Sequence, residues 1–112
     1  YNTALGDSAL SLATTASSNT AVGRAALADN TTGAGNVAVG ALTLDANTTG
    51  VNSTAVGYNA LGGNSTASGN TALGHQAMLI NSTGASNVAV GAYALDANTT
   101  ANNNDSKIIL YL

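Results

Sequence analysis

Residues 19–35 read NTAVGRAALADNTTGAG, and residues 36–52 read NVAVGALTLDANTTGVN, which is the same pattern 17 residues further along the chain. The opening five-residue block occurs six times at this step, without an insertion. It reads NTALG, NTAVG, NVAVG, STAVG, NTALG and NVAVG, and the copies begin at Asn2, Asn19, Asn36, Ser53, Asn70 and Asn87. We number the repeat positions 1 to 17 from these six residues. An uninterrupted short period is typical of solenoids, in which each repeat forms one turn and packs only on its neighbours.

The repeat positions that vary least indicate a β-rich turn. Position 3 is always Ala, position 5 always Gly, position 14 always Thr, and position 4 always Val or Leu. Two short strand-like pieces, N-T-A-V-G and x-A-L-x, are separated by the Gly, which permits a sharp bend. The N-T-T-G segment that follows has the local chemistry of a return turn. We therefore expect an all-β fold, a parallel β-solenoid or β-roll of six 17-residue rungs over residues 1–103.

The interior is expected to be thin and aliphatic. Alternation along a strand places positions 2 and 4 on one face and positions 3 and 5 on the other. We expect positions 4 and 9 to form the core. Position 4 holds Leu5, Val22, Val39, Val56, Leu73 and Val90, and position 9 holds Leu10, Leu27, Leu44, Leu61, Met78 and Leu95. The Ala and Gly of positions 3 and 5 would then form a flat outer strip that suits the close packing of subunits around an axis.

The last nine residues depart from the repeat. Lys107 stands where the repeat has Val or Leu, and an unbroken apolar run follows it, made of Ile108, Ile109, Leu110, Tyr111 and Leu112. The run is too short to span a bilayer, and an exposed strand of this kind would invite aggregation. We expect residues 104–112 to form a capping strand on the last rung or a strand that pairs with a neighbouring subunit.

The composition excludes several classes of function. Charged residues make up 6 % of the chain, the net charge is −3, and Arg24 and Lys107 are its two cations, so no basic patch can bind nucleic acid. The chain has no Cys, and no membrane span is visible. A solid thin rod offers no pocket, and no Ser-His-Asp arrangement stands apart from the repeat. We predict no catalytic residue, no cofactor, no metal site and no enzymatic activity.

The block N-T-A-V-G-x-x-A-L followed by N-T-T-G-x-N resembles the head repeats of trimeric autotransporter adhesins, which are built around an A-I-G or A-V-G core. It is also similar to the repeat tracts of phage tail-fibre and bacterial surface proteins. The resemblance covers residues 2–103. It implies a left-handed parallel β-roll, assembly of three copies about a common axis, exposure outside the cell and a role in attachment, with the aliphatic residues of position 4 in the core. The adhesin repeat is shorter, and the extra length here lies in the N-T-T-G turn.

A column of Asn at position 12 allows two interpretations. Its members, each the start of an N-x-S/T sequence, are Asn30, Asn47, Asn64, Asn81 and Asn98. One interpretation is N-glycosylation, because N-x-S/T is the acceptor sequence in secreted chains. The other is an internal ladder of amide hydrogen bonds, which we favour because glycans on successive rungs would be only about 4.8 Å apart.

Three further features have weaker implications. The invariant Thr of position 14 is similar to the flat threonine arrays of ice-binding solenoids, although Val37 and Val88 interrupt the threonines of position 2. His75, the single histidine, occupies a variable position and is interpreted as a surface residue. Asp45 and Asp96 recur in matching LDANTT segments, but without Glu or a calcium-binding repeat motif they do not predict a metal site.

The sequence therefore predicts a structural or adhesive segment of an extracellular or cell-surface fibre. The expected partners are other copies of the chain, as a homotrimer or a filament, and a host-surface receptor or glycan. Nucleic-acid binding and membrane insertion are not expected. Two alternatives remain open: the shaft of a phage tail fibre, which would place the chain in a virion tail, and an ice-binding solenoid.

Overall fold

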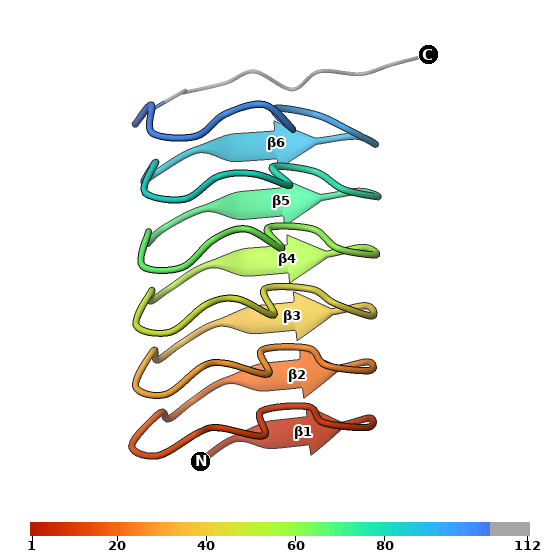
Figure 1. The fold of residues 1–112 in the computed structure, drawn as a ribbon, viewed down its shortest axis with the longest axis vertical. Coiled ribbons are helices and arrows are strands. Elements are labelled where there is room, and N and C mark those ends of the chain that lie inside the picture. Colours follow the sequence, from red (N-terminus) through yellow and green to blue (C-terminus); the bar gives the residue numbers. More distant parts are fainter. Residues whose placement is uncertain (104–112) are drawn as a thin grey trace.

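The computed structural model describes residues 1–103, which form a single stack of turns around one axis (Figure 1). Each turn contributes one three-residue strand, and the six strands form one parallel sheet in the order β1-β2-β3-β4-β5-β6. The strands are β1 (Thr3–Leu5), β2 (Thr20–Val22), β3 (Val37–Val39), β4 (Thr54–Val56), β5 (Thr71–Leu73) and β6 (Val88–Val90). The tail predicted to cap the stack, residues 104–112, lies outside the described residues.

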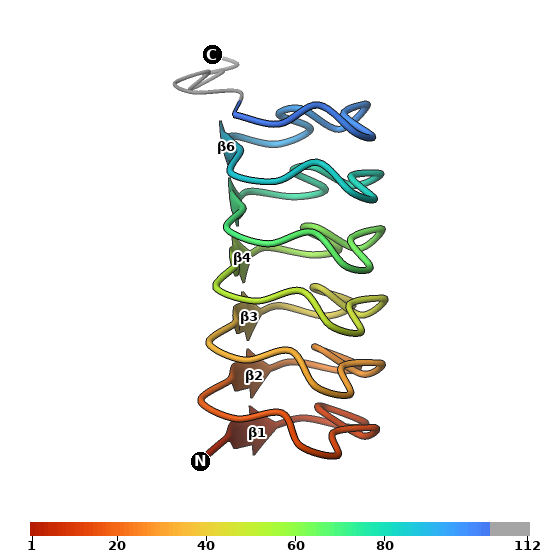
Figure 2. The same ribbon diagram turned by 90° about the vertical axis from the view of Figure 1, so that its left-hand side faces the viewer.

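The register repeats every 17 residues. Ala21 pairs with Ala38, and Ala38 pairs with Ala55, so that identical repeat positions lie above one another. The expectation of an all-β parallel solenoid with 17-residue rungs is thus confirmed. Figure 2 shows the turns following one another in a straight column, and the rod measures 36 × 23 × 18 Å along its principal axes.

Backbone hydrogen bonds join neighbouring rungs well beyond the strands. At the start of the strand, the Thr20 N–H donates to the Asn36 carbonyl at 2.9 Å. On the opposite side of the rung, the Leu27 N–H donates to the Thr43 carbonyl at 3.0 Å. Both bonds recur along the stack, so each rung serves as the template for the next, as expected of a solenoid.

One predicted element is wrong. The x-A-L-x piece does not form a second strand, because its backbone turns through the left-handed region at positions 7 and 9. Leu27, for example, has φ of 52° and Ala25 has φ of 57°. The αL conformation costs an L-residue about 1–2 kcal/mol, whereas full burial of a leucine side chain contributes about 1.5–3 kcal/mol. Burial of the position-9 side chain can therefore offset the cost of its own backbone conformation.

The glycine of position 5 meets two requirements at once. Gly40 has φ of 131°, and a Cβ placed on it would lie 2.7 Å from the carbonyl oxygen of Gly57 in the next rung. Both the backbone conformation and the close approach of the next rung exclude a side chain here. The same approach is seen at the other position-5 glycines with a rung above them, which explains why the position does not vary.

Of the two positions predicted to form the core, position 9 is confirmed and position 4 is wrong. Position 9 is inside: Leu10, Leu27, Leu44, Leu61 and Met78 are buried, and Leu95 is half-buried. Position 4 points outward. Its members are half-buried or exposed, and the most exposed are Leu5 at 67 %, Val56 at 39 % and Leu73 at 37 %. The alanines predicted to form an outer strip lie inside instead, and they are fully buried from Ala21 to Ala89.

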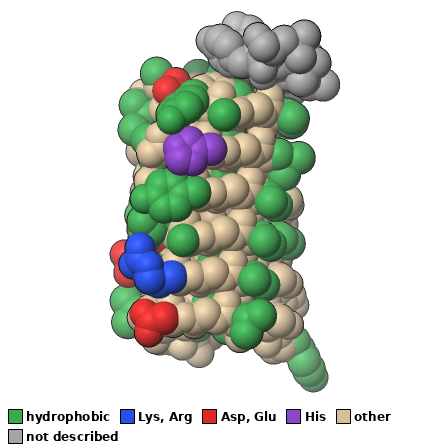
Figure 3. All heavy atoms as spheres, turned by 90° about the vertical axis from the view of Figure 1, so that its right-hand side faces the viewer, with side chains coloured by type: hydrophobic (Ala, Val, Ile, Leu, Met, Phe, Trp, Pro, Cys, Tyr) green, Lys and Arg blue, Asp and Glu red, His purple; other side chains and the backbone are tan. Residues whose placement is uncertain are grey.

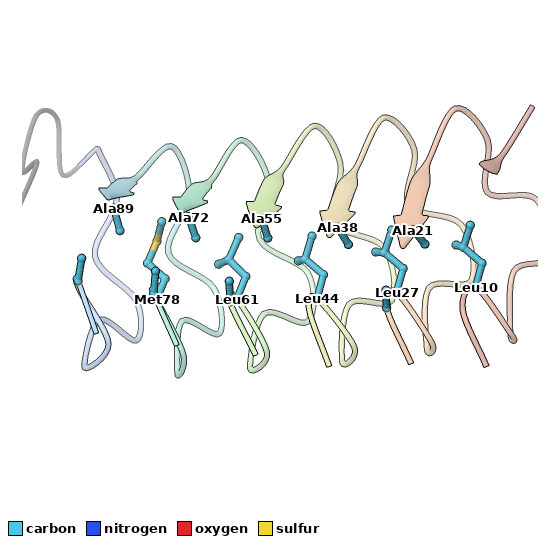
Figure 4. Close-up of a cluster of buried hydrophobic side chains, with 14 residues drawn as sticks. Leu10, Ala21, Leu27, Ala38, Leu44, Ala55, Leu61, Ala72, Met78 and Ala89 are labelled. Carbon is cyan, nitrogen blue, oxygen red and sulfur yellow. The ribbon is translucent and has the colours of Figure 1, made fainter. Parts of the chain in front are cut away.

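Figure 4 shows the reason for this inversion. The strand alanines and the position-9 side chains point toward one another across a narrow interior, so the long side chain from one wall occupies the space left by the short side chain of the other. A second column of small residues, position 8, completes the apolar core with Ala26, Ala60, Ala77 and Ala94. A Val at position 3 would overfill this space, because protein interiors are close-packed.

Candidate functional site

The other half of the interior is polar and consists of two columns of stacked amides. The position-12 side chains hydrogen-bond from rung to rung: Asn47 Nδ2 donates to Asn30 Oδ1 at 2.8 Å, and Asn64 Nδ2 donates to Asn47 Oδ1 at 3.0 Å. Each Nδ2 also donates within its own rung, as from Asn47 to the Gly50 carbonyl at 3.1 Å. The position-12 side chains thus form the predicted internal ladder of amide hydrogen bonds.

Burial of the ladder argues directly against glycans at these positions. Asn30, Asn47, Asn64 and Asn81 are at most 1 % exposed, and Asn98 in the last rung is half-buried. Their Nδ2 atoms, which would carry the sugar, donate hydrogen bonds inside the rod. A glycan there would require the rung to open and would leave its partners unsatisfied.

A second amide column, at position 1, was not predicted. The backbone N–H of Asn36 donates to Asn19 Oδ1 at 2.9 Å, and Asn36 Nδ2 donates to the Gly50 carbonyl at 2.8 Å. Ser53 replaces Asn in the fourth rung, where its Oγ accepts from the Asn70 N–H at 3.2 Å. The signal was present in the sequence, because position 1 holds Asn in five of the six repeats. Within residues 1–103, no buried side-chain nitrogen or oxygen lacks a hydrogen-bond partner.

Three faces of the outer surface differ in the residue types that they carry. The first, which we call the sheet face, consists of the outward side chains of positions 2 and 4 on β1 to β6. These side chains are Thr, Val or Leu in every rung, and none is charged. Since the strands are parallel and in register, the face is a regular strip along the whole rod.

The second face, the turn edge, consists of positions 6 and 7, which follow the glycine bend. It carries an aromatic column in which the Tyr58 and His75 rings stack with centroids 5.4 Å apart, and Tyr93 meets His75 edge-on at 5.2 Å. All three side chains are exposed. Arg24 and Asp7 occupy the same edge in the first two rungs. Figure 3 views the rod from this side and shows acidic, basic, hydrophobic and histidine side chains following one another along this edge.

The third face, the threonine column, consists of the position-14 residues Thr15, Thr32, Thr49, Thr66, Thr83 and Thr100. All six are exposed. Position 13 precedes each of them, and four of its six hydroxyls donate to the next rung. For example, Thr31 Oγ1 donates to the Thr48 carbonyl at 3.1 Å, and Thr48 Oγ1 donates to the Ser65 carbonyl at 3.1 Å.

The acidic residues do not gather into a site. Burial raises the pKa of the Asp45 carboxyl above its ordinary value, backbone hydrogen bonds from Asp45 and Ala46 oppose the shift, and repulsion from Asp29 adds to it. Asp96 lies three rungs further along the rod. In the described part of the chain, no three His, Cys, Asp or Glu side chains are close enough to hold a metal ion, and no pocket is present.

Among residues 1–103 there is also no helix with the length and apolar character needed to cross a bilayer. Comparison with protein-family models, with curated proteins and with solved structures yields no match to this chain.

Proposed function

We propose that this chain is a structural and adhesive segment of an extracellular or cell-surface fibre, in which three copies associate through their sheet faces. The observation that carries the proposal is the residue type at position 4. All six residues are Val or Leu, although all six point away from the core and three are more than a third exposed. Soluble monomers rarely leave a continuous apolar strip uncovered, and such strips mark interaction surfaces.

The geometry of the sheet face favours side-by-side packing of identical rods. The strip is uncharged and regular, so a second copy can contact it without burying an unpaired ion. A cyclic arrangement about an axis parallel to the rods covers the strip on every copy and closes the assembly. The interface thus uses positions 2 and 4, and not the alanine and glycine strip expected from the sequence.

The rod is expected to be stiff because hydrogen bonds connect every rung to the next. Inter-rung backbone bonds and two amide columns hold neighbouring turns together along the whole rod, as a fibre segment requires. The turn edge varies between rungs and stays accessible in such an assembly. We assign adhesion to this edge, with Tyr58, His75 and Tyr93 as contacts for a host-surface receptor or glycan. The shaft of a phage tail fibre would use the same two surfaces, the sheet face for assembly and the turn edge for attachment.

The assembly is tested by the mass of the intact complex in solution. Two double variants place the same charge in the same two rungs: Val39→Asp with Val56→Asp on the sheet face, and Thr49→Asp with Thr66→Asp on the threonine column. We expect the wild type and the threonine-column variant to have three times the chain mass and the sheet-face variant to have the single-chain mass. A wild type that stays monomeric at high concentration, or equal dissociation of both variants, would contradict the proposed interface. An open series of masses would indicate a filament.

A further inference from the structure

The threonine column has a chemistry that the fold does not require. Thr occupies position 14 in all six rungs, its side chain is exposed in all six, and no Oγ1 in the column makes a hydrogen bond within residues 1–103. Four of the six position-13 hydroxyls beside it do bond to the next rung, and Ser replaces Thr there in two repeats. Position 14 thus keeps both the hydroxyl and the methyl group without an intramolecular use for the hydroxyl.

The column is held rigidly and at a regular spacing. Four of the position-14 N–H groups donate to the next rung, as from Thr32 to the Thr48 carbonyl at 3.2 Å and from Thr83 to the Thr99 carbonyl at 3.1 Å. Because the rungs stack in register, successive threonines are about 4.8 Å apart. A β-branched side chain has few rotamers, so the six hydroxyl and methyl groups form a preordered array.

The residues around the column are uncharged and mostly small. Position 15 is Gly or Ala and is buried in rungs 1 to 5, while position 16 holds small or short side chains beside the threonines. No charged residue occurs at positions 13 to 16 in any repeat. The strip therefore consists of small polar and apolar groups.

These properties restrict the class of ligand. Binding of a nucleic acid would require positively charged side chains, and positions 13 to 16 supply none. A protein surface that binds glycans commonly offers aromatic rings for stacking on the sugars. The aromatic rings of this chain within residues 2–103 lie on the turn edge instead. An ordered array of hydroxyl and methyl groups at fixed spacing instead fits a ligand that is itself a lattice of neutral hydrogen-bonding units. We infer that the threonine column binds ice: each hydroxyl holds one water, each methyl group is surrounded by water, and the rung spacing aligns these waters with an ice surface.

The test is thermal hysteresis and the shaping of ice crystals by the purified chain. It uses the two double variants already described, Thr49→Asp with Thr66→Asp and Val39→Asp with Val56→Asp, together with Tyr58→Asp on the turn edge. We expect hysteresis in the wild type, its loss in the threonine-column variant, and its retention in the other two. Circular dichroism before each measurement shows whether the variant is folded. The double variant Thr49→Ser with Thr66→Ser keeps the hydroxyl groups but removes the methyl groups. It should weaken the thermal hysteresis without unfolding the rod.

Absence of hysteresis in the folded wild type would overturn the inference. So would equal hysteresis in the threonine-column variant, or a loss confined to the sheet-face variant. The complex mass is measured separately, and the threonine-column variant is expected to keep it, so failure of ice binding and failure of the proposed assembly are distinguishable.

Discussion

At the scale of single residues, the amides inside the rungs complete hydrogen bonds that the backbone leaves open. Asn36 shows the pattern: its Oδ1 accepts from the N–H of the next rung, and its Nδ2 donates to the carbonyl of Gly50. The side chain thereby links two segments of one rung and joins that rung to the next. Buried groups of this kind cost about 1–3 kcal/mol when a partner is removed, so each amide is a local requirement of the fold.

Ser53 is the one interruption of the position-1 column, and it predicts a stabilising substitution. Asn at this position should restore the Nδ2 bond to the Ala67 carbonyl, which now accepts from Asn64 alone among the side chains. We expect Ser53→Asn to raise the free energy of unfolding by about 1 kcal/mol, the usual net value of a hydrogen bond. Denaturant titration measures the change. Thr54→Asn, one residue later and facing outward, is the control, and an equal gain there would contradict the explanation.

Asp45 predicts how stability depends on pH. Because burial raises the pKa of this carboxyl in the folded chain, the folded state binds the proton more readily than the unfolded chain does. Its contribution is therefore fully present below the unfolded pKa and is lost as the pH rises through the folded pKa. We expect Asp45→Asn to flatten the acid-range slope of the unfolding free energy and to stabilise the rod at pH 7. The exposed Asp7→Asn substitution is the control, and an unchanged slope for Asp45→Asn would be evidence against this assignment.

At the scale of the rung, some features were predictable and others were not. The 17-residue period and the strand at positions 2 to 4 could be predicted because repetition and alternation are visible in the sequence. The inward face could not, because Val is larger than Ala and was expected to fill the core. The deciding factor is the position-9 side chain from the opposite wall, whose αL backbone at a leucine, such as φ of 51° at Leu44, has no sequence signal.

The corrected core predicts different costs for two aliphatic residues in the same rung. Leu44→Ala removes a fully buried side chain and should destabilise the rod by about 2–5 kcal/mol. Val39→Ala removes a half-exposed side chain, so we expect about 1 kcal/mol or less. Denaturant unfolding, at concentrations too low for self-association, compares the two. A larger cost for Val39→Ala would restore the interpretation that position 4 forms the core.

The rung is also the unit that can be removed. Deleting residues 36–52 takes out one complete turn and joins Gly35 to Ser53 in phase, so we expect a shorter rod that still unfolds cooperatively. Deleting residues 36–47 removes part of a turn and shifts every later side chain out of its column, and we expect loss of the β-sheet circular dichroism signal. Similar behaviour of the two deletions would show that the stacking phase does not determine the fold.

At the scale of the whole molecule, one repeat produces three continuous surfaces. A residue type repeated at one position becomes a column along the rod, so an aliphatic position becomes the sheet face and a threonine position becomes the threonine column. Positions 6 and 7, which lie on the turn edge, are among the positions that vary between rungs. Assembly, adhesion and ice binding are thus assigned to separate sides of the rod, and each can be altered without changing the interior.

All of these assignments require that like positions lie above one another at constant spacing. The most direct measurement is the distance between spin labels on the exposed threonines of position 14, in chains diluted with unlabelled protein. Pairs at Thr15 and Thr66, three rungs apart, and at Thr15 and Thr100, five rungs apart, should give narrow distance distributions centred at ~14 Å and ~24 Å, an increase of about 4.8 Å per rung. Broad distributions, or an increase that does not follow the number of rungs, would contradict the stacked rod.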